Sequence, residues 1–485
     1  MKTLQAFFLL LTLCGPVHAV DTLDLPDIGN STGTFLSPEY ERRLGQAFLN
    51  SVRKQADIID DPEIETYVQS VGYRLVSHSD NNTQPFTFFV VNDPQINAFA
   101  APGGIVGINS GTIINSDSES ELAGVMAHEI AHVTQHHMAR SIEMQQSLTL
   151  PMLAAMLGAI LIATQNPDAG GAAIAAVQGG MAQAQINFTR QNEEEADRIG
   201  IQLLSRSGFN PFGMTTFFEK LQKNSRYFAQ APEFLRSHPL TTNRIAESES
   251  RAESYPASKS FDESTTYKYV RAKLLVRSFK SPAEAVKYYE DQLAGVEQVD
   301  PDGSLRYGYV QALMAAGKLD RARDYLDLLI KQDPENITFL LASAALEKQR
   351  NNFDGALKIY DRAAHLYPDY RPLVLNYANT LLQAKRPEAA RDLLRKYGKF
   401  TDPDLTYYDY LTRAEAESGN PIESGMANAE YYFLAGETRV AIERLRFILR
   451  QRSPQPDYYQ QERIHARLAS LEQELQIEKD LKLAK

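Results

Sequence analysis

A pattern that returns every 34 residues constrains the C-terminal half of this chain more than any other feature. Each copy has a small residue, an aromatic residue or leucine four positions later, and a proline at its end. Small residues let paired helices approach closely, and proline stops the second helix of a pair. A fixed period of this length is typical of stacked helical pairs. The positions are Ala322, Leu326 and Pro334; Ala356, Tyr360 and Pro368; and Ala390, Leu394 and Pro403, the last proline one place late.

Two further copies extend the pattern in both directions. "SPAEAVKYYEDQLAGVE" is a weaker copy around Ala285, and "GETRVAIERLRFILRQRSPQPD", around Ala441, is out of phase by half a unit. These segments resemble tetratricopeptide repeats, whose stacked pairs form a curved groove that usually holds a protein partner. An irregular helical bundle is the alternative, and the regular spacing argues against it. We expect an all-α tetratricopeptide-repeat solenoid over residues 265–485.

The length and charge of the chain limit what the rest can be. A chain of 485 residues suggests more than one domain. The formal net charge is −11 and no block of Lys and Arg interrupts it, so we expect no nucleic-acid partner. A polar stretch with Pro256, residues 250–266, marks a boundary. We therefore expect a second domain over residues 20–255.

The first 19 residues have the features of a cleavable secretory signal. "MKTLQAFFLLLTLCGPVHA" has one lysine, an apolar run, a Gly-Pro breaker and a small-residue ending. Cys14 raises a lipoprotein alternative, but Leu13 is bulkier than the residue such signals use there. Cleavage after Ala19 would remove Cys14, the one cysteine of the chain. A secreted chain of this length without disulfides is best placed in a bacterial periplasm.

The segment before the boundary predicts a mostly helical domain with a small sheet. Residues 38–75 have helical periodicity, "PFTFFVVN" predicts a strand, and "NAFAAPGGIVGINSG" predicts two short strands around a Pro-Gly-Gly turn. Ser118 and Glu121 form a capping-box signal for a following helix. Further helices are expected over residues 188–207 and 211–224. Together with the metal motif below, this predicts an α+β, zincin-like fold.

One apolar segment complicates this interpretation. Residues 148–164, "LTLPMLAAMLGAILIAT", carry no charge but are at the lower limit for a membrane span and contain Pro151. A transmembrane hairpin, and with it an integral membrane protease, is one alternative. We favour a helical lid or an element with a peripheral membrane contact.

The sequence "HEIAH", residues 128–132, is an HExxH motif on the helix that follows Ser118. His128 and His132 are four residues apart, so both imidazoles lie on one helix face and reach one ion. Glu129 is rotated about 100° from His128, beside the metal, where it acts as the base for a water molecule. The motif predicts a single zinc ion and a hydrolytic reaction. A structural histidine pair is the alternative.

Two more histidines follow in "HVTQHH". On a straight helix His136 would lie about 6 Å further along the axis than His132, too far to share a tetrahedral ion. His137 would point elsewhere. We interpret both as residues of the helix surface or as groups behind the ligands.

The third ligand must then come from another element, and "RQNEEEADRIGIQLL" is the best candidate. Glu193 lies on the small, apolar face of that helix, where a buried carboxylate needs a partner such as zinc. Asp197, one turn on, is placed to accept a hydrogen bond from a ligand imidazole and fix its orientation. Glu194 aligns with Arg198 and is better explained as a solvent ion pair.

HEIAH with the downstream Glu193 and Asp197 is similar to gluzincin peptidases of the HtpX and CAAX-prenyl-protease superfamily. "NAFAAPGG", "EEEADRIGIQLL", "SHPLTTNRI", the signal and the repeats extend the resemblance over nearly the full mature length. It implies a zinc metalloendopeptidase with His128, His132 and Glu193 as ligands. It also implies quality control of outer-membrane β-barrel proteins and a chaperone-like role in their assembly. The implied partners are unfolded or misassembled outer-membrane proteins and, through the repeats, the barrel assembly machinery.

The resemblance also identifies His238, on a loop that covers the zinc in such enzymes. Two roles are open for this residue: a fourth ligand that keeps the resting enzyme shut, which we prefer, or a donor to the oxyanion. Arg244 is expected to anchor the same loop or to stabilise the oxyanion. The strand at residues 97–101 is expected to pair with an extended substrate. The rival to an active protease is a scaffold or chaperone with a gated, largely silent peptidase site.

Overall fold

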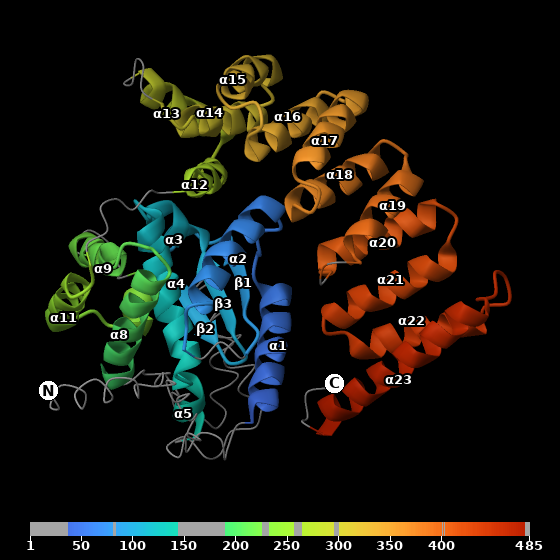
Figure 1. The fold of residues 1–485 in the computed structure, drawn as a ribbon, viewed down its shortest axis with the longest axis horizontal. Helices are drawn as coiled ribbons and strands as arrows, with labels where there is room; N and C mark the ends of the chain where they lie inside the picture. Colours follow the sequence, from blue (N-terminus) through green and yellow to red (C-terminus); the bar gives the residue numbers. More distant parts are fainter. Residues whose placement is uncertain are drawn as a thin grey trace, which may run out of the picture.

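The fold is described by a computed structural model that covers residues 37–80, 84–143, 190–225, 232–256, 264–294, 300–399, 401 and 403–480. In Figure 1 the elements α1 to α11 form a mixed body, which is the expected peptidase domain and is called the peptidase body below, and α12 to α23 form an arc of helices that passes over it and down its other side. The predicted signal, residues 1–19, and the apolar segment, residues 148–164, lie outside the described residues. Within the described ranges, no helix has both the length and the apolar character that a membrane crossing requires.

The sheet has three strands in the order β1-β3-β2: β1 (Thr87–Val91), β2 (Ala98–Ala101) and β3 (Ile105–Asn109). β1 and β3 are parallel, and β2 and β3 are antiparallel. The predicted strands and turn are thus confirmed, with Gly103 and Gly104 in the positive-φ conformation that the tight turn requires.

Helices cover both faces of this sheet, because successive strand residues point to opposite sides. Phe89 and Ile105 face α1 (Pro38–Gln55), while Phe88 and Val106 face the main core with α2 (Pro62–Val76). The sequence predicted one helical segment over residues 38–75. Two helices occur instead, because the chain between them pairs with the sheet edge through an isolated bridge from Ile58 to Val91.

The centre of the peptidase body is α4 (Glu119–Thr134), whose residues are all buried. Its predicted cap is present: the amide of Glu121 donates to the Ser118 hydroxyl over 3.1 Å. α8 (Arg190–Arg206) and α9 (Phe212–Ser225) pack against it, as predicted for residues 188–207 and 211–224. The remaining helices of this part are α3 (Ser110–Asn115), α5 (His137–Glu143), α10 (Glu233–Ser237) and α11 (Thr242–Glu253).

The C-terminal part is a succession of antiparallel helices, and the segments that carry the 34-residue pattern are α13, α15, α17, α19 and α22. Their small residues Ala285, Ala322, Ala356, Ala390 and Ala441 are all buried to 0% exposure. The helices are α12 (Thr265–Ser278), α13 (Pro282–Ala294), α14 (Ser304–Ala315), α15 (Leu319–Gln332), α16 (Ile337–Gln349), α17 (Phe353–Leu366), α18 (Arg371–Gln383), α19 (Pro387–Tyr397), α20 (Leu405–Glu417), α21 (Pro421–Leu434), α22 (Thr438–Arg450) and α23 (Tyr458–Asp480).

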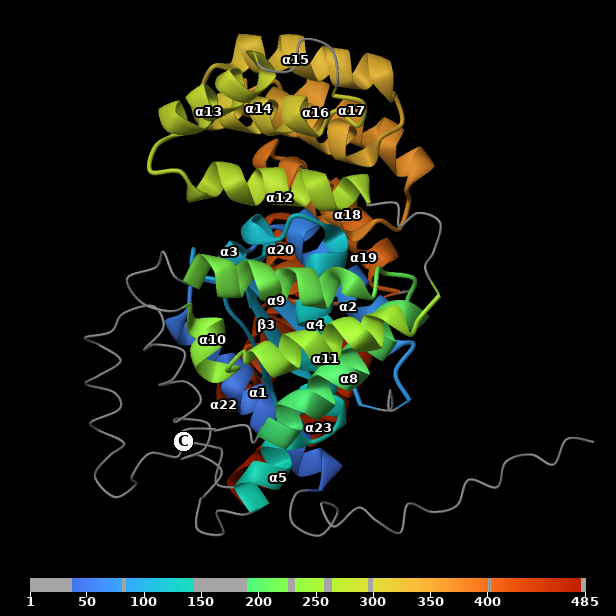
Figure 2. The same cartoon turned by 90° about the vertical axis from the view of Figure 1, so that its left-hand side faces the viewer.

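α12 joins the two parts. Tyr267 and Leu274 belong to the core of the peptidase body, whereas Tyr269 and Ala272 belong to the first cluster of the repeats. Figure 2 shows α12 as a layer between the peptidase helices and α13 to α17. The domain limits predicted at residues 255 and 265 stay predictions. The structure adds that the two parts share one helix in their cores.

Candidate metal centre

His128 and His132 face each other on α4, one turn apart. Their Nε2 atoms are 3.0 Å apart, and the two side chains are 0% and 4% exposed. The helix itself fixes this pair, since residues at i and i+4 lie on the same face. Two imidazole nitrogens at this distance direct their lone pairs to one point, which is the arrangement that the HExxH spacing predicted.

Glu193 reaches the same point from α8, which packs along α4. Its carboxylate oxygens lie 3.5 Å from the Nε2 atoms of His128 and His132. Burial raises the pKa of this carboxyl, but the charge of His238 and hydrogen bonds with His128 and His238 hold it well below its usual range. An ionised, buried carboxylate beside two imidazoles is suited to a cation.

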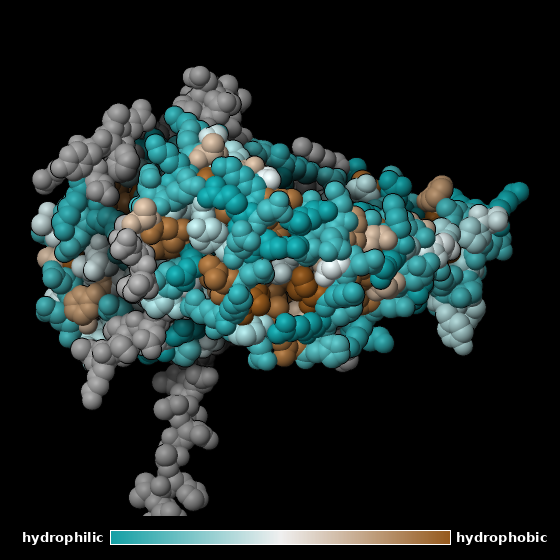
Figure 3. All heavy atoms as spheres, turned by 90° about the horizontal axis from the view of Figure 1, so that it is seen from above, coloured by the Kyte–Doolittle hydropathy of each residue, from teal (hydrophilic) through white to brown (hydrophobic). Residues whose placement is uncertain are grey.

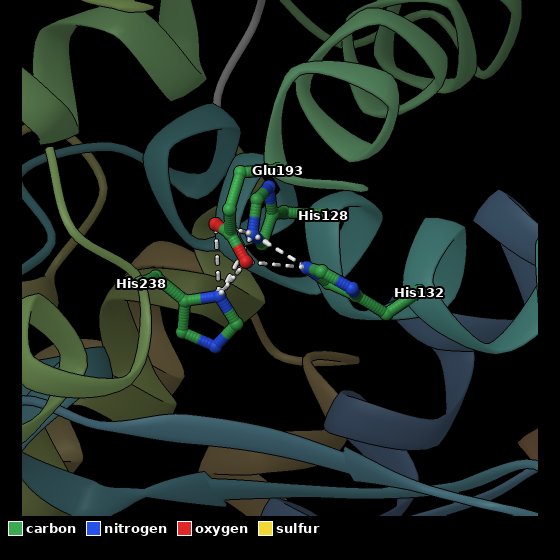
Figure 4. A group of neighbouring side chains, drawn as sticks. All are labelled: His128, His132, Glu193 and His238. Atoms are coloured by element: carbon green, nitrogen blue, oxygen red, sulfur yellow. Dashed lines mark hydrogen bonds and ion pairs between the residues drawn. The ribbon is translucent and has the colours of Figure 1, made fainter. Parts of the chain in front are cut away.

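His238 completes the group from the segment just after α10 (Figure 4). Its Nδ1 lies 3.2 Å from the Nε2 of His128 and 3.2 Å from each carboxylate oxygen of Glu193. The ring stacks on Phe234 with the centroids 4.8 Å apart, and the residue is 2% exposed. His238 is therefore part of the cluster in this conformation and not a loop residue in solvent.

The four side chains have the dimensions of a tetrahedral zinc site. One donor atom from each lies within 4.8 Å of all the others, and the separations around His128 and Glu193 run from 3.0 to 3.5 Å. Donor atoms about 2.0–2.2 Å from a tetrahedral zinc ion would be roughly 3.3–3.6 Å from each other. Two or three imidazoles with one carboxylate is also the donor set that zinc prefers. The residues fit the metal.

Glu129 lies beside this cluster. Its Oε1 is 3.5 Å from the Nε2 of His238, and this buried oxygen has no hydrogen-bond partner among the described residues. Burial raises the pKa of the Glu129 carboxyl. A buried carboxylate oxygen without a partner is costly and is typical of a site that receives a further polar molecule.

Asp197 and Arg244 support the cluster from behind. An Asp197 oxygen lies 3.0 Å from the Nδ1 of His128, on the side of the ring away from the cluster. Arg244, on α11, donates to both Asp197 oxygens at 2.8 and 2.9 Å. Arg244 also lies 3.0 Å from Glu193 and donates to the carbonyl of Pro239 over 2.7 Å. One guanidinium thus ties two acidic side chains of α8 to the segment that carries His238.

His137 lies behind the ligand His132, which is one of the two predicted alternatives, but it does not point elsewhere as a straight helix suggested. α4 ends at Thr134, and His136 adopts a left-handed conformation with φ of 52° before α5 begins at His137. This break turns His137 back, so that its Nδ1 lies 2.8 Å from the Nδ1 of His132. A straight helix would have kept the two apart.

His136 lies on the helix surface, which is one of the two alternatives predicted for it. It is a partly exposed residue at the helix end that lies 3.2 Å from Glu41 of α1. The predicted partner of Glu194 was wrong. Glu194 pairs with Arg190 at 2.7 Å, and Arg198 lies 3.7 Å from Glu195 instead.

Comparisons with known proteins define the class. Residues 62–252 match the peptidase family M48, and residues 278–346 and 348–415 match the tetratricopeptide repeat. The chain is therefore a metallopeptidase that carries tetratricopeptide repeats, as the motifs predicted.

The relatives of the chain identify a narrower group within this class. The chain is 38% identical to the β-barrel assembly-enhancing protease of Escherichia coli over 431 residues, which cover 89% of this chain and 88% of that one. It is 36% identical to the putative β-barrel assembly-enhancing protease of Vibrio cholerae over 87% of each chain. The mitochondrial metalloendopeptidase OMA1 of Schizosaccharomyces pombe is 27% identical over 50% of this chain and 71% of its own. The chain belongs to the family of β-barrel assembly-enhancing proteases.

Proposed function

We propose that this protein is a zinc-dependent endopeptidase of the bacterial periplasm that removes misassembled outer-membrane β-barrel proteins and assists the assembly of others. The observation that carries the proposal is the convergence of His128, His132 and Glu193 beside the unpartnered, buried carboxylate of Glu129. The names of the relatives, β-barrel assembly-enhancing proteases of two bacteria, support the choice of client and of compartment. The N-terminal 19 residues would then be the export signal.

In this proposal each residue has one task. A zinc ion held by the two histidines and Glu193 would supply Lewis acidity toward a water molecule and the scissile carbonyl. Glu129 takes the proton from the water and returns it to the leaving amine. Its raised pKa brings the carboxyl closer to neutrality, which favours this two-way transfer. Asp197 keeps the His128 ring in place through its Nδ1, and Arg244 holds Asp197.

The position of His238 favours a resting enzyme that is closed. Its Nδ1 lies with the donor atoms of the proposed ligands, and its ring is buried between Phe234 and the cluster. As a fourth ligand it would occupy the position that a catalytic zinc keeps open for water. Opening would require the segment around Pro239, which Arg244 holds, to move. A chaperone or scaffold whose peptidase is largely silent is the second candidate, and this closed arrangement supports it.

The edge strand β2 is placed to present the substrate. Ala100 and Ala101 line a pocket together with His132 and Val133 of α4. An extended client segment could add to this edge as a further strand, with its backbone beside the metal ligands. Unfolded β-barrel segments are extended and rich in such edges.

The repeat arc would bring clients or assembly machinery to the site. Viewed from above, its surface is mostly hydrophilic with short hydrophobic stretches between (Figure 3). A surface of this kind is suited to transient protein partners. The segment 148–164 stays a proposed lid or peripheral membrane contact.

The test is degradation of a misfolded β-barrel client by wild type, Glu129→Gln and His238→Ala. We expect Glu129→Gln to retain zinc and to lose cleavage, because only the proton acceptor is gone. We expect His238→Ala to cleave faster than wild type if the residue gates the site. A fall of His238→Ala to the Glu129→Gln level would favour the oxyanion role. Barrel assembly that survives in Glu129→Gln would separate the chaperone activity from proteolysis.

A further inference from the structure

His137 is the most deeply buried polar side chain of the site for which the mechanism above has no task. The residue is 0% exposed, and its ring lies against His132 with the centroids 4.8 Å apart and the planes at 77°. The Nδ1 atoms of the two rings are 2.8 Å apart. On its other side, the Nε2 of His137 lies 3.1 Å from Glu195, and Glu195 lies 3.0 Å from Arg140.

We propose that His137 is a positioning residue for the metal centre: with Glu195 and Arg140 it forms a relay that fixes the ring orientation and the tautomer of His132. The inference rests on the proposed function, because it requires that His132 bind the metal through Nε2. That leaves the proton of His132 on Nδ1, which donates to the Nδ1 of His137. His137 in turn carries its proton on Nε2 and donates it to Glu195.

The relay has the same construction as the one behind the other histidine. His128 has Asp197 and then Arg244 behind its Nδ1, and His132 has His137, Glu195 and Arg140 behind its own. A metal-bound histidine needs such a partner, because the partner fixes which ring nitrogen is free to bind. Here the partner of His132 is an imidazole and not a carboxylate, so it adds no negative charge directly behind the ligand.

The charges around the relay agree with this direction of donation. The Nδ1 of His137 faces the Nδ1 of His132 at 2.8 Å and its Nε2 faces a Glu195 oxygen at 3.1 Å, so one neutral ring can accept on the first side and donate on the second. The guanidinium of Arg140 donates to the same Glu195 oxygen over 3.0 Å, which places a positive charge at the end of the chain of contacts. Glu195 is therefore an ionised acceptor at the end of the chain.

The backbone is shaped to place this residue. His136 is one of the few described residues other than glycine with a positive φ, at 52°. A left-handed conformation is strained for a residue other than glycine, and it persists only where the surroundings require it. His136 lies between the end of α4 at Thr134 and the start of α5 at His137. Its conformation starts α5 in a direction that turns the His137 ring toward His132. The left-handed conformation of His136 thus brings the His137 ring into contact with His132.

The test is zinc affinity of the full chain in the Glu129→Gln background, measured by competition with a chelating indicator. We expect His137→Phe to weaken zinc binding about 10- to 100-fold, the usual cost of losing such a partner. His137→Gln, which accepts and donates through its amide, should recover most of the affinity. His136→Asn is the matched control: it tolerates the left-handed conformation and should bind zinc like the background.

A second readout separates orientation from folding. In the cobalt-substituted protein, the ring N–H of His132 should exchange slowly with solvent, and His137→Phe should make that exchange fast. Unchanged affinity in His137→Phe, equal losses in His137→Phe and His137→Gln, or an equal loss in His136→Asn would overturn the relay. If the Glu129→Gln chain itself binds no zinc, the proposed function fails and not this inference alone.

Discussion

At the scale of single residues, Arg244 joins two acidic side chains of α8 to the segment that carries His238. It contacts Glu193, Asp197 and the carbonyl of Pro239 with one planar group that is 2% exposed. Lysine has the charge but lacks the fork that serves two acceptors at once. We therefore expect Arg244→Lys to lose about 10- to 100-fold in zinc affinity or cleavage rate. Arg251→Lys, an exposed ion pair on the same helix, is the control and should behave as wild type.

Wild-type zinc affinity and cleavage in Arg244→Lys would mean that the three contacts do not position the site. A loss of the same size in Arg251→Lys would mean that α11 as a whole is being perturbed.

Helix periodicity placed His128 with His132, and Glu193 with Asp197, on one face of each helix. The expectation that the two faces meet came from the buried carboxylate of Glu193 and from the family resemblance. The i, i+4 spacing puts each pair on one face, and the burial of Glu193 follows from the small residues around it. The contact of His137 with His132 was not predicted, because it depends on one φ angle at His136 and no glycine or asparagine at that position indicates a helix end. The available signal was the run of three glutamates, in which Glu195 is the one placed to receive the second imidazole.

At the scale of elements, the open edge of β2 is the part of the sheet that faces a substrate. The amide of Asn109 donates to the carbonyl of Asn97, and hydrogen-bonded pairs alternate along an antiparallel ladder. Phe99 therefore points its N–H at Gly107, while Ala98 and Ala100 point theirs away from β3. An added strand would therefore form its hydrogen bonds with the backbone of Ala100, in the pocket that His132 also lines.

We expect Ala100→Pro to reduce cleavage of an extended client at least tenfold while zinc binding stays as in wild type. Proline removes one outward N–H, which an edge strand tolerates without losing its own ladder. One lost hydrogen bond to substrate in a desolvated site is worth about 1–3 kcal/mol. Ala100→Val keeps the N–H and should keep most of the rate. Full activity of Ala100→Pro in a folded protein would exclude pairing at this position.

α12 and α2 are held together by a buried ion pair. Lys273 lies 2.9 Å from Asp61 and 2.5 Å from Glu63, and all three side chains are at most 13% exposed. Burial raises the pKa of Asp61, but the charge and hydrogen bond of Lys273 outweigh it, so the pKa is lowered overall. A carboxyl group whose pKa is lower in the folded state stabilises the fold fully at a pH above its unfolded-state pKa. This contribution is lost as the pH falls through the lowered, folded-state pKa.

Lys273→Met should cost about 3–5 kcal/mol of unfolding free energy at pH 8, because Glu63 then stays buried without its cation and Asp61 keeps only Arg277, 3.3 Å away. Burial then raises their pKa values, so they take up protons as the pH falls. The difference from wild type should therefore shrink between pH 8 and pH 5, as measured by chemical denaturation. Lys268→Met, at a half-exposed pair on the same helix, should cost less than about 1 kcal/mol. A difference independent of pH would contradict the ion-pair account.

At the scale of the whole molecule, the repeats contact the rest of the chain at several points. α22 and α23 return to α1, where Lys54 pairs with Glu437 at 2.6 Å and Arg43 with Glu474 at 2.9 Å. Arg371 of α18 also pairs with Glu65 of α2 at 2.8 Å. The arc in Figure 1 is thus attached to the peptidase body at its beginning, its middle and its end.

The repeat spacing predicted the solenoid but not this attachment. Periodic small residues report only the packing of one helix against the next within the arc. The contacts of the later repeats with α1 and α2 include charged pairs between residues more than 300 positions apart, and such pairs have no period. The sequence likewise did not predict that the two parts share α12, because the two faces of this helix pack into two different cores.

The central claim is that one metal ion, held by His128, His132 and Glu193, makes this chain a peptidase with Glu129 as its base. The most direct measurement is a titration of metal-free protein with zinc while cleavage of a misfolded β-barrel client is followed. The account predicts no cleavage at the start, a rise that ends at one zinc per chain, and no rise in Glu129→Gln although it binds the same single ion. Cleavage that needs no metal, or that Glu129→Gln performs at the wild-type rate, would contradict it.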